Sequence, residues 1–169
     1  LNRLLIDRAI SDGVDTVITC DNGIAAKEEI AYGKKLGLTV VVTDHHEVPF
    51  TEVEGEKQYQ LPPADAVIDP KRVDCPYPFD GLCGAGVAYK LVEALTEAMG
   101  EDSTDLDDLM ENVAIATIGD VMDLVDENRI FVRQGLEMLK RTKNLGLRAL
   151  MECTNIPKDG INPYHIGFI

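Results

Sequence analysis

Two short apolar runs, each followed by an acidic residue, set the pattern of the first part of the chain. Residues 14–20 and 38–43 are rich in β-branched side chains and predict β-strands. Between them, residues 24–36 carry apolar side chains at helical spacing, and Gly37 follows as a helix-ending residue. A connection that contains a helix joins parallel strands in a right-handed sense. The pattern therefore predicts a strand, a helix and a second, parallel strand in one sheet.

The flanking segments add one helix and one strand to this unit. Residues 1–12 predict a helix that packs on the sheet through an apolar stripe, formed by Leu4, Leu5, Ile6, Ala9 and Ile10. Residues 51–63 are polar, show no periodicity and contain two prolines, which predicts a loop. Residues 64–68 predict a short third strand. The first half of the chain is therefore expected to be an α/β layer.

Helical patterns dominate beyond residue 81. Helices are predicted over residues 82–100, 102–116, 126–142 and 146–152, and from residue 162 to the end. Ser103 or Thr104 caps the second of these helices, and residues 117–125 leave helical periodicity. The inward face of the helix over 126–142 consists of Ile130, Val132, Leu136 and Leu139. We predict an α/β fold in one domain, with a parallel Rossmann-like sheet flanked by helices and a helical C-terminal portion.

Polar residues follow the first two predicted strands at the point where each strand stops. Asp21 follows the first strand, and Asp44, His45 and His46 follow the second. The carboxyl ends of parallel strands lie on one edge of a sheet, where ligands bind in open α/β folds. Asp21 alone would be read as a helix-capping residue. Two adjacent histidines behind an aspartate, facing a second aspartate, instead indicate a metal site.

Two further aspartates, at a strand end and in apolar surroundings, are additional candidates for the site. Asp69 ends the third predicted strand and could join the site, but the Asp69-Pro70 pair favours a simple turn. Asp120 follows Gly119 in apolar surroundings, so its carboxylate requires backbone amides or a cation as partner.

Composition narrows the class of protein. The 16 basic residues are outnumbered by 30 acidic ones, and a net charge of −14 argues against a broad nucleic-acid-binding face. Divalent cations in a carboxylate-lined cleft reverse that charge locally. The four cysteines form no CxxC pair, which indicates reduced thiols in a cytoplasmic protein and disfavours structural zinc. No apolar stretch approaches the ~20 residues that a membrane span requires.

The predicted cluster of carboxylates and imidazoles indicates a chemistry. This donor set suits Mn²⁺ or Mg²⁺ better than a thiolate-rich site does. Two such ions ~3.5–4 Å apart hold a phosphoryl group, lower the pKa of a bridging water and stabilise the leaving oxygen. The pattern therefore predicts metal-dependent hydrolysis of a phosphoester and does not select the substrate.

Residues 42–49, Val-Thr-Asp-His-His-Glu-Val-Pro, resemble the signature of the DHH phosphoesterase superfamily. The neighbouring segments are similar to its RecJ branch of single-strand-specific 5′→3′ DNA exonucleases, and they are residues 18–24, 83–91 and 116–129. The resemblance runs in order through nearly the whole chain. It implies a hydrolase that degrades single-stranded DNA in recombination and repair, with replication and repair proteins as further partners and no membrane.

The resemblance also implies roles for five residues. Asp21 matches the aspartate that bridges two metal ions, and His45 matches a ligand of one ion. Asp120 matches an aspartate on that same ion, which accounts for a carboxylate in apolar surroundings. His46 matches the histidine that contacts the scissile phosphate, and Asp44 orients the imidazoles.

The family's first motif, an Asp-x-Asp on a preceding strand, has no counterpart in residues 1–169. The second, nucleic-acid-gripping domain of RecJ proteins is likewise not matched. The resemblance therefore implies a partial catalytic domain, truncated at both ends, that is inactive or nearly so by itself. Such a piece is expected to hold at most half of the two-metal site. Loss of a neighbouring parallel strand exposes a sheet edge, which predicts self-association.

Two alternatives remain open from the sequence. The first is another DHH phosphoesterase, acting on small nucleotides or on inorganic pyrophosphate. The second is a noncatalytic DHH-like scaffold that binds nucleic acid or a replication protein. Presence of Asp21, His45, His46 and Asp120 counts against the scaffold.

Overall fold

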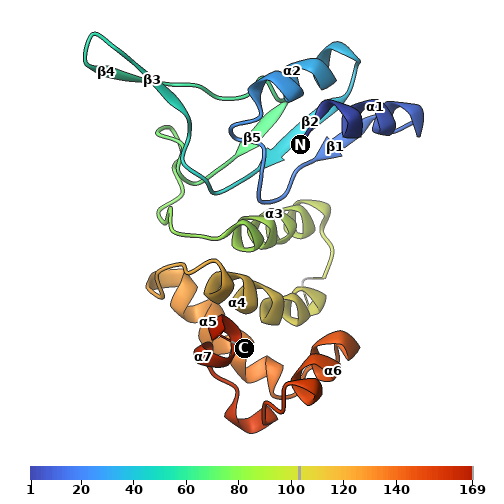
Figure 1. The fold of residues 1–169 in the computed structure, drawn as a ribbon, viewed down its shortest axis with the longest axis vertical. Helices are drawn as coiled ribbons and strands as arrows, with labels where there is room; N and C mark the ends of the chain where they lie inside the picture. The colour runs from blue at the N-terminus through green and yellow to red at the C-terminus, as the bar shows by residue number, and fades with distance from the viewer. Residues whose placement is uncertain (103, 169) are drawn as a thin grey trace. The chain divides into compact units, whose positions relative to one another are not determined.

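The computed structural model describes residues 1–102 and 104–168, which fall into two compact units (Figure 1). The first unit ends at Asp80 and the second begins at Gly81. The first is an α/β layer and the second is helical, as the sequence predicts. Each unit is described separately below.

A three-stranded parallel sheet forms the centre of the first unit. Strand β2 (Thr39–Thr43) lies between β1 (Thr16–Ile18) and β5 (Ala66–Ile68). In register, Ile18 lies beside Val41, and Thr43 lies beside Ile68. The three strands therefore end at one edge, as predicted for parallel strands. The core beneath them consists of Ile6, Ile30, Leu38, Val40 and Val42.

Two helices accompany this sheet, α1 (Arg3–Ser11) and α2 (Lys27–Lys35). The prediction that the apolar stripe of α1 packs on the sheet is wrong for most of its residues. Only Ile6 of this helix is buried, whereas Leu4 is 79% exposed and Leu5 is 56% exposed. Spacing tells which side chains share a helix face, but it does not tell how much of that face another element covers.

The predicted loop over residues 51–63 is wrong as well, because most of it forms a β-hairpin. Strand β3 (Phe50–Val53) pairs antiparallel with β4 (Glu56–Tyr59). Glu54 and Gly55 both have positive φ angles, of 54° and 85°, and such a two-residue turn matches the twist of a hairpin. All residues of both strands are exposed, so no buried face imposes a hydrophobic alternation on the sequence.

The second unit consists of helices. They are α3 (Gly84–Met99), η1 (Thr104–Leu109), α4 (Met110–Gly119), α5 (Asp126–Leu139), α6 (Leu145–Cys153), η2 (Lys158–Gly160) and α7 (Pro163–Phe168). The segment predicted to leave helical periodicity at residue 117 remains helical to Gly119. In α5, Phe131 is buried and packs edge-on against Tyr89, whereas Ile130, predicted to face inward, is exposed. Ser103, one of the two predicted caps, lies outside the described residues.

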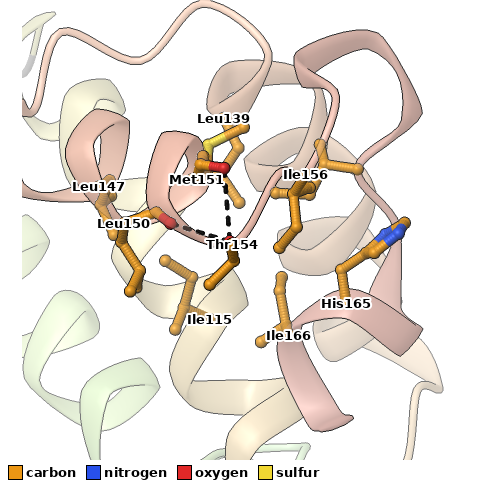
Figure 2. Close-up of a pocket in the computed structure, with 10 residues that line it drawn as sticks. Ile115, Leu139, Leu147, Leu150, Met151, Thr154, Ile156, His165 and Ile166 are labelled. Carbon is orange, nitrogen blue, oxygen red and sulfur yellow. Dashed lines mark hydrogen bonds between the residues drawn. The ribbon is translucent and has the colours of Figure 1, made fainter. Parts of the chain in front are cut away.

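Leu139, Met151 and Ile161 form a small apolar cluster in the second unit, and Figure 2 labels Leu139 and Met151. The cluster borders a cavity of about 140 Å³ that is lined mainly by aliphatic side chains of α4, α6 and α7. Across the described residues, none of the helices has the length and apolar character that crossing a membrane requires.

Candidate metal centre

The ends of β1 and β2 are tied together just beyond the sheet. The Thr43 hydroxyl donates to the Thr19 carbonyl over 2.7 Å, and the Thr43 amide donates to the same carbonyl over 3.3 Å. Gly23 turns the chain with φ 118°, and a Cβ there would lie 2.9 Å from Thr19 Oγ1. Only glycine fits this turn, because both the conformation and the space exclude a side chain. The loop between β1 and α2 is therefore pressed against the sheet edge, with Asp21 at its tip.

Asp44, directly after β2, is a buried carboxylate that organises this edge. Its Oδ2 accepts a hydrogen bond from the Ile24 amide over 2.8 Å. Its Oδ1 accepts from the His45 amide at 2.8 Å and from His46 Nδ1 at 2.6 Å. Burial raises the pKa of Asp44, but the hydrogen bonds from His46, Ile24 and His45 outweigh it and lower the pKa below its ordinary value. Asp44 is therefore an anion whose role is to position its neighbours.

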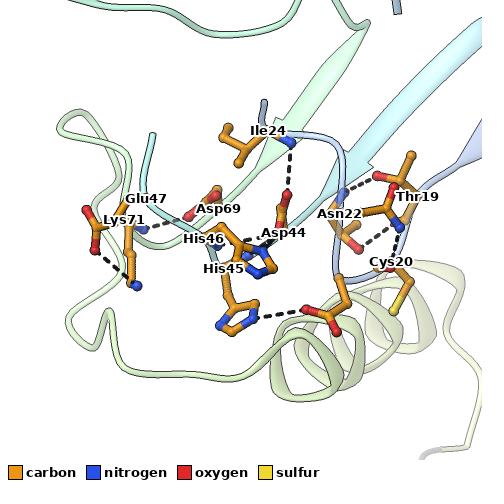
Figure 3. A network of polar contacts seen from close by, with 12 residues as sticks. Thr19, Cys20, Asn22, Ile24, Asp44, His45, His46, Glu47, Asp69 and Lys71 are labelled. Carbon is orange, nitrogen blue, oxygen red and sulfur yellow. Dashed lines mark hydrogen bonds and ion pairs between the residues drawn. The ribbon is translucent and has the colours of Figure 1, made fainter. Parts of the chain in front are cut away.

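Asp21, His45 and His46 converge at the edge, and Figure 3 shows the two histidines next to Asp44. His45 is buried, and its Nε2 lies 2.9 Å from Asp21 Oδ1. The His46 ring lies 4.5 Å from the His45 ring, between centroids, and its side chain is 60% exposed. One ligand atom from each of the three residues lies within 4.8 Å of the others. The convergence that the sequence predicts for Asp21 and the Asp-His-His triplet is present in the structure.

The hydrogen bond from His46 to Asp44 fixes the protonation pattern of the His46 ring. A carboxylate only accepts hydrogen bonds, so the proton on this contact belongs to Nδ1. The Nε2 of His46 then carries a lone pair or, in the imidazolium, a second donor. An imidazole in this setting can bind a metal ion or hydrogen-bond to an anionic oxygen.

Asp69 is a buried carboxylate at the end of β5, next to the tip of β2. The Asp44 amide donates to the Ile68 carbonyl over 3.0 Å, which places the two aspartates on neighbouring strand ends. The predicted turn is present, since Asp69 Oδ1 accepts from the Lys71 amide over 2.9 Å. Yet Asp69 is only 2% exposed, and its Oδ2 has no hydrogen-bond partner among the described residues. Burial, with the charge of Asp44, raises the pKa of Asp69 to about 6.

Asp120 belongs to the second unit, where it follows the last residue of α4 and is exposed. Its amide donates to the Ala116 carbonyl over 2.8 Å, so the helix end fixes its backbone. The segment after it is held by Asn128, whose side-chain amide donates to the carbonyls of Asp123 and Gly81. The role of Asp120 as a metal ligand stays a prediction.

Most of the chain matches the model of a known protein family. The model of the DHH family, N-terminal domain, matches residues 2–117. The chain belongs to the DHH family. The family membership predicted from residues 42–49 is thereby confirmed.

Two curated relatives of this DHH-family chain are RecJ exonucleases. The chain is 42% identical to the single-stranded-DNA-specific exonuclease RecJ of Bacillus subtilis over 92% of its own length and 18% of the relative. It is 32% identical to RecJ of Escherichia coli over 99% of its own length and 29% of the relative. The chain thus spans less than a third of the length of these relatives.

Solved structures resemble the DHH-family chain in fold as well. A crystal structure of exonuclease RecJ bound to manganese matches 99% of the chain and 39% of the solved chain, with a TM-score of 0.79 and 27% identity. RecJ of Thermus thermophilus in complex with Mn²⁺ matches 96% of the chain and 23% of the solved chain, with a TM-score of 0.73 and 28% identity. The predicted α/β class with a helical C-terminal portion is confirmed by this likeness.

The sequence pattern predicts the clustered metal donors, but not the residues that hold the strand ends together or lie buried next to them. Thr19 and Thr43, which join the strand ends, carry no sequence signal beyond their place at the ends of β-branched runs. Asp69 did carry a sequence signal, because it stands at the end of a third strand in the same way that Asp21 and Asp44 stand after the first two. A turn and a buried site neighbour are compatible roles for this residue, and the structure shows both features.

Proposed function

We propose that this chain forms part of the catalytic domain of a metal-dependent nuclease that degrades single-stranded DNA from its 5′ end, in recombination and repair. The observation that carries the proposal is the convergence of Asp21, His45 and His46 at the carboxyl edge of the sheet. The similarity to RecJ exonucleases along nearly the whole chain supports the choice of substrate.

Mn²⁺ or Mg²⁺ fits the donors present at this edge. Asp21 offers carboxylate oxygen and His45 offers a buried imidazole nitrogen, and their closest atoms are 2.9 Å apart. Harder divalent cations accept such a mixed set without thiolates. We assign Asp21, His45 and, from the second unit, Asp120 to metal binding, with two ions in the complete enzyme and at most a half-site here. Bound ions of this kind supply Lewis acidity and a water of lowered pKa.

His46 and Asp44 act on the phosphate in this proposal. Asp44 holds His46 through the 2.6 Å contact to Nδ1, and the His46 side chain is 60% exposed. The Nε2 of an imidazolium donates a hydrogen bond to a non-bridging phosphate oxygen and offsets part of its charge. The buried Asp44 carboxylate, with its lowered pKa, favours that imidazolium and fixes its orientation.

The proposal extends to the setting of the reaction. We place it in the cytoplasm, in contact with replication and repair proteins, because its DNA substrate is handled there. None of the four cysteines is paired in a disulfide, which is consistent with a reducing compartment. We also propose that the isolated chain self-associates through the β1 edge of its sheet.

Titration calorimetry with Mn²⁺ tests the site on the 169-residue chain. We expect about one ion per chain, and loss of binding in His45→Ala and in Asp120→Ala. Asp159→Ala serves as a control, since this acidic residue lies in η2 near the end of the chain. Folding of each variant is checked by circular dichroism. Equal binding by all variants would contradict the assignment.

Activity is tested on the full-length protein that carries this chain. We expect Mn²⁺-dependent release of nucleotides from 5′-labelled single-stranded DNA, lost in His46→Ala. Hydrolysis confined to dinucleotides or pyrophosphate would point to another DHH phosphoesterase. DNA binding without hydrolysis of any of these substrates would point to the scaffold.

A further inference from the structure

Five α-helices in the described part of the chain end in the same backbone motif. After each helix, one amide donates to the carbonyl three residues back, and the next amide donates to the carbonyl five residues back. This pair of hydrogen bonds is the Schellman motif, and the residue that donates the first of them adopts a left-handed conformation. The residues in this conformation are Gly13, Gly37, Gly100, Val121 and Asn155, after α1, α2, α3, α4 and α6.

Val121 is out of place in this set. Glycine has no Cβ to clash in the left-handed region, and asparagine tolerates it. Valine carries a branched Cβ, and a β-branched residue with positive φ is a genuine outlier. Val121 nevertheless has φ 56°, and the motif is complete: the Val121 amide donates to the Ile118 carbonyl and the Met122 amide donates to the Thr117 carbonyl, over 3.1 Å each. The sequence therefore places a poorly suited residue at the end of α4.

Packing within the described residues does not account for this choice. The Val121 side chain is 88% exposed, so burial contributes little to offset its backbone strain. Leu124 and Val125 in the same connection to α5 are exposed as well. The connection is nevertheless held in place, because Asn128 donates to the Asp123 carbonyl over 3.0 Å. An ordered, exposed apolar surface thus follows Asp120.

The position of Val121 next to Asp120 indicates which ligand the exposed apolar surface of Val121, Leu124 and Val125 binds. Strained residues are retained where function requires them, and Asp120 is the residue assigned above to metal binding. A chain with 30 acidic and 16 basic residues repels a polyanion on average, so contacts with sugars and bases carry more of the binding. Such apolar contacts tolerate any base sequence.

We propose that Val121 is a substrate-contacting residue, whose isopropyl group packs against a sugar and base of single-stranded DNA next to Asp120. This inference rests on the proposed nuclease function and extends it. The Val121 side chain is 88% exposed, and the neighbouring Asp120 is held at the end of α4 by its own amide, which donates to the Ala116 carbonyl. The strain at Val121 is retained for substrate binding.

The test uses Val121→Gly and Val121→Ala in the full-length protein, with Asn155→Gly as the matched control. Asn155 occupies the same position of the same motif after α6, with φ 55°. We expect Val121→Gly and Asn155→Gly to leave the thermal unfolding temperature unchanged or raised, because glycine relieves strain. Val121→Gly and Val121→Ala should raise KM for single-stranded DNA about three- to tenfold through lost apolar contact. Asn155→Gly should leave KM unchanged.

Metal affinity separates a substrate contact from a change at Asp120. We expect the Mn²⁺ dissociation constant of Val121→Ala to stay within about twofold of wild type, because this variant keeps the Cβ. Weaker Mn²⁺ binding in step with the rise in KM would overturn the inference. So would an unchanged KM, or a lowered unfolding temperature in both Val121 variants, which would mean that Val121 packs against protein. A wild-type protein that does not degrade single-stranded DNA would instead refute the proposed function itself.

Discussion

Asp44 and Asp69 show how two buried carboxylates at one sheet edge are treated differently by their surroundings. Both oxygens of Asp44 accept hydrogen bonds, from the amides of Ile24 and His45 and from the His46 ring. Asp69 has a single amide donor, on Oδ1. Hydrogen bonds stabilise the charged form, whereas burial without them favours the neutral form. The pKa of Asp44 is therefore lowered and that of Asp69 is raised.

The raised pKa of Asp69 predicts a loss of stability as pH rises. In the unfolded chain this carboxyl titrates near its ordinary value of about 4. With a folded pKa of about 6, the folded state binds more protons between pH 4 and 6, so its stability falls across that window. The shift corresponds to a loss of about 3 kcal/mol in the free energy of unfolding. Urea unfolding of the metal-free chain from pH 4 to 8 measures it.

Asp69→Asn is the matched variant for this measurement, since it keeps the shape but cannot ionise. We expect its free energy of unfolding to fall less steeply than that of wild type between pH 4 and 6, and to exceed the wild-type value at pH 8. Asp44 does not confound the window, because its lowered pKa acts below pH 4. Parallel curves for the two proteins would show that Asp69 titrates normally.

At the scale of elements, α4 and α5 of the second unit approach each other closely at a glycine. A Cβ on Gly135 of α5 would lie 2.3 Å from Ala114 Cβ and 2.7 Å from the Met110 carbonyl oxygen of α4. These atoms belong to the backbone and to a short side chain, so they cannot move aside without shifting a helix. The absence of a side chain at Gly135 therefore sets the distance between α4 and α5.

Gly135→Ala is predicted to destabilise the chain by about 1–3 kcal/mol through overpacking. Gly119 provides the control, because it ends α4 and a Cβ there would meet no atom within 4 Å. Gly119→Ala should be neutral or raise the free energy of unfolding by up to about 1 kcal/mol, as helix propensity favours alanine. Denaturant unfolding of both variants, followed by circular dichroism, decides the matter. A Gly135→Ala variant as stable as wild type would contradict this packing.

At the scale of the whole molecule, the proposed self-association depends on β1. Within the described residues, β1 pairs with β2 on one side and with no strand on the other. Ile18 at its end is 60% exposed, and unpaired strand edges with apolar side chains pair with other chains. The net charge of −14 opposes this association between identical chains and is screened by salt.

Sedimentation velocity of the 169-residue chain at rising concentration and at high salt tests the edge. We expect dimers or larger species for wild type and a monomer for Ile18→Lys, because an edge lysine resists strand pairing. Val73→Lys is the control, since this exposed valine lies outside the three strands and the change in charge is the same. A wild-type monomer at all concentrations would contradict the proposal. A monomer in both variants would assign the effect to charge alone.

Local sequence determined the elements wherever the structure buries one face of them. The runs around Val17 and Val42 and the helical spacing between them gave the strands, the crossover and the edge where Asp21 meets His45, because burial imposes a periodicity on sequence. The Asp-His-His triplet, together with residues 18–24, 83–91 and 116–129, also carried the resemblance to the family. The hairpin of β3 and β4 escaped prediction because neither face is buried.

Tertiary structure alone decided how much each side chain is covered. Leu4 shares a stripe with Ile6 but is exposed, and Asp69 is a turn residue by sequence but is buried beside Asp44. Coverage depends on elements far apart in the chain, so spacing cannot reveal it. Val121 needed the structure for the same reason: its sequence reads as an ordinary apolar residue, and only the backbone angle and the open surface around it mark it as unusual.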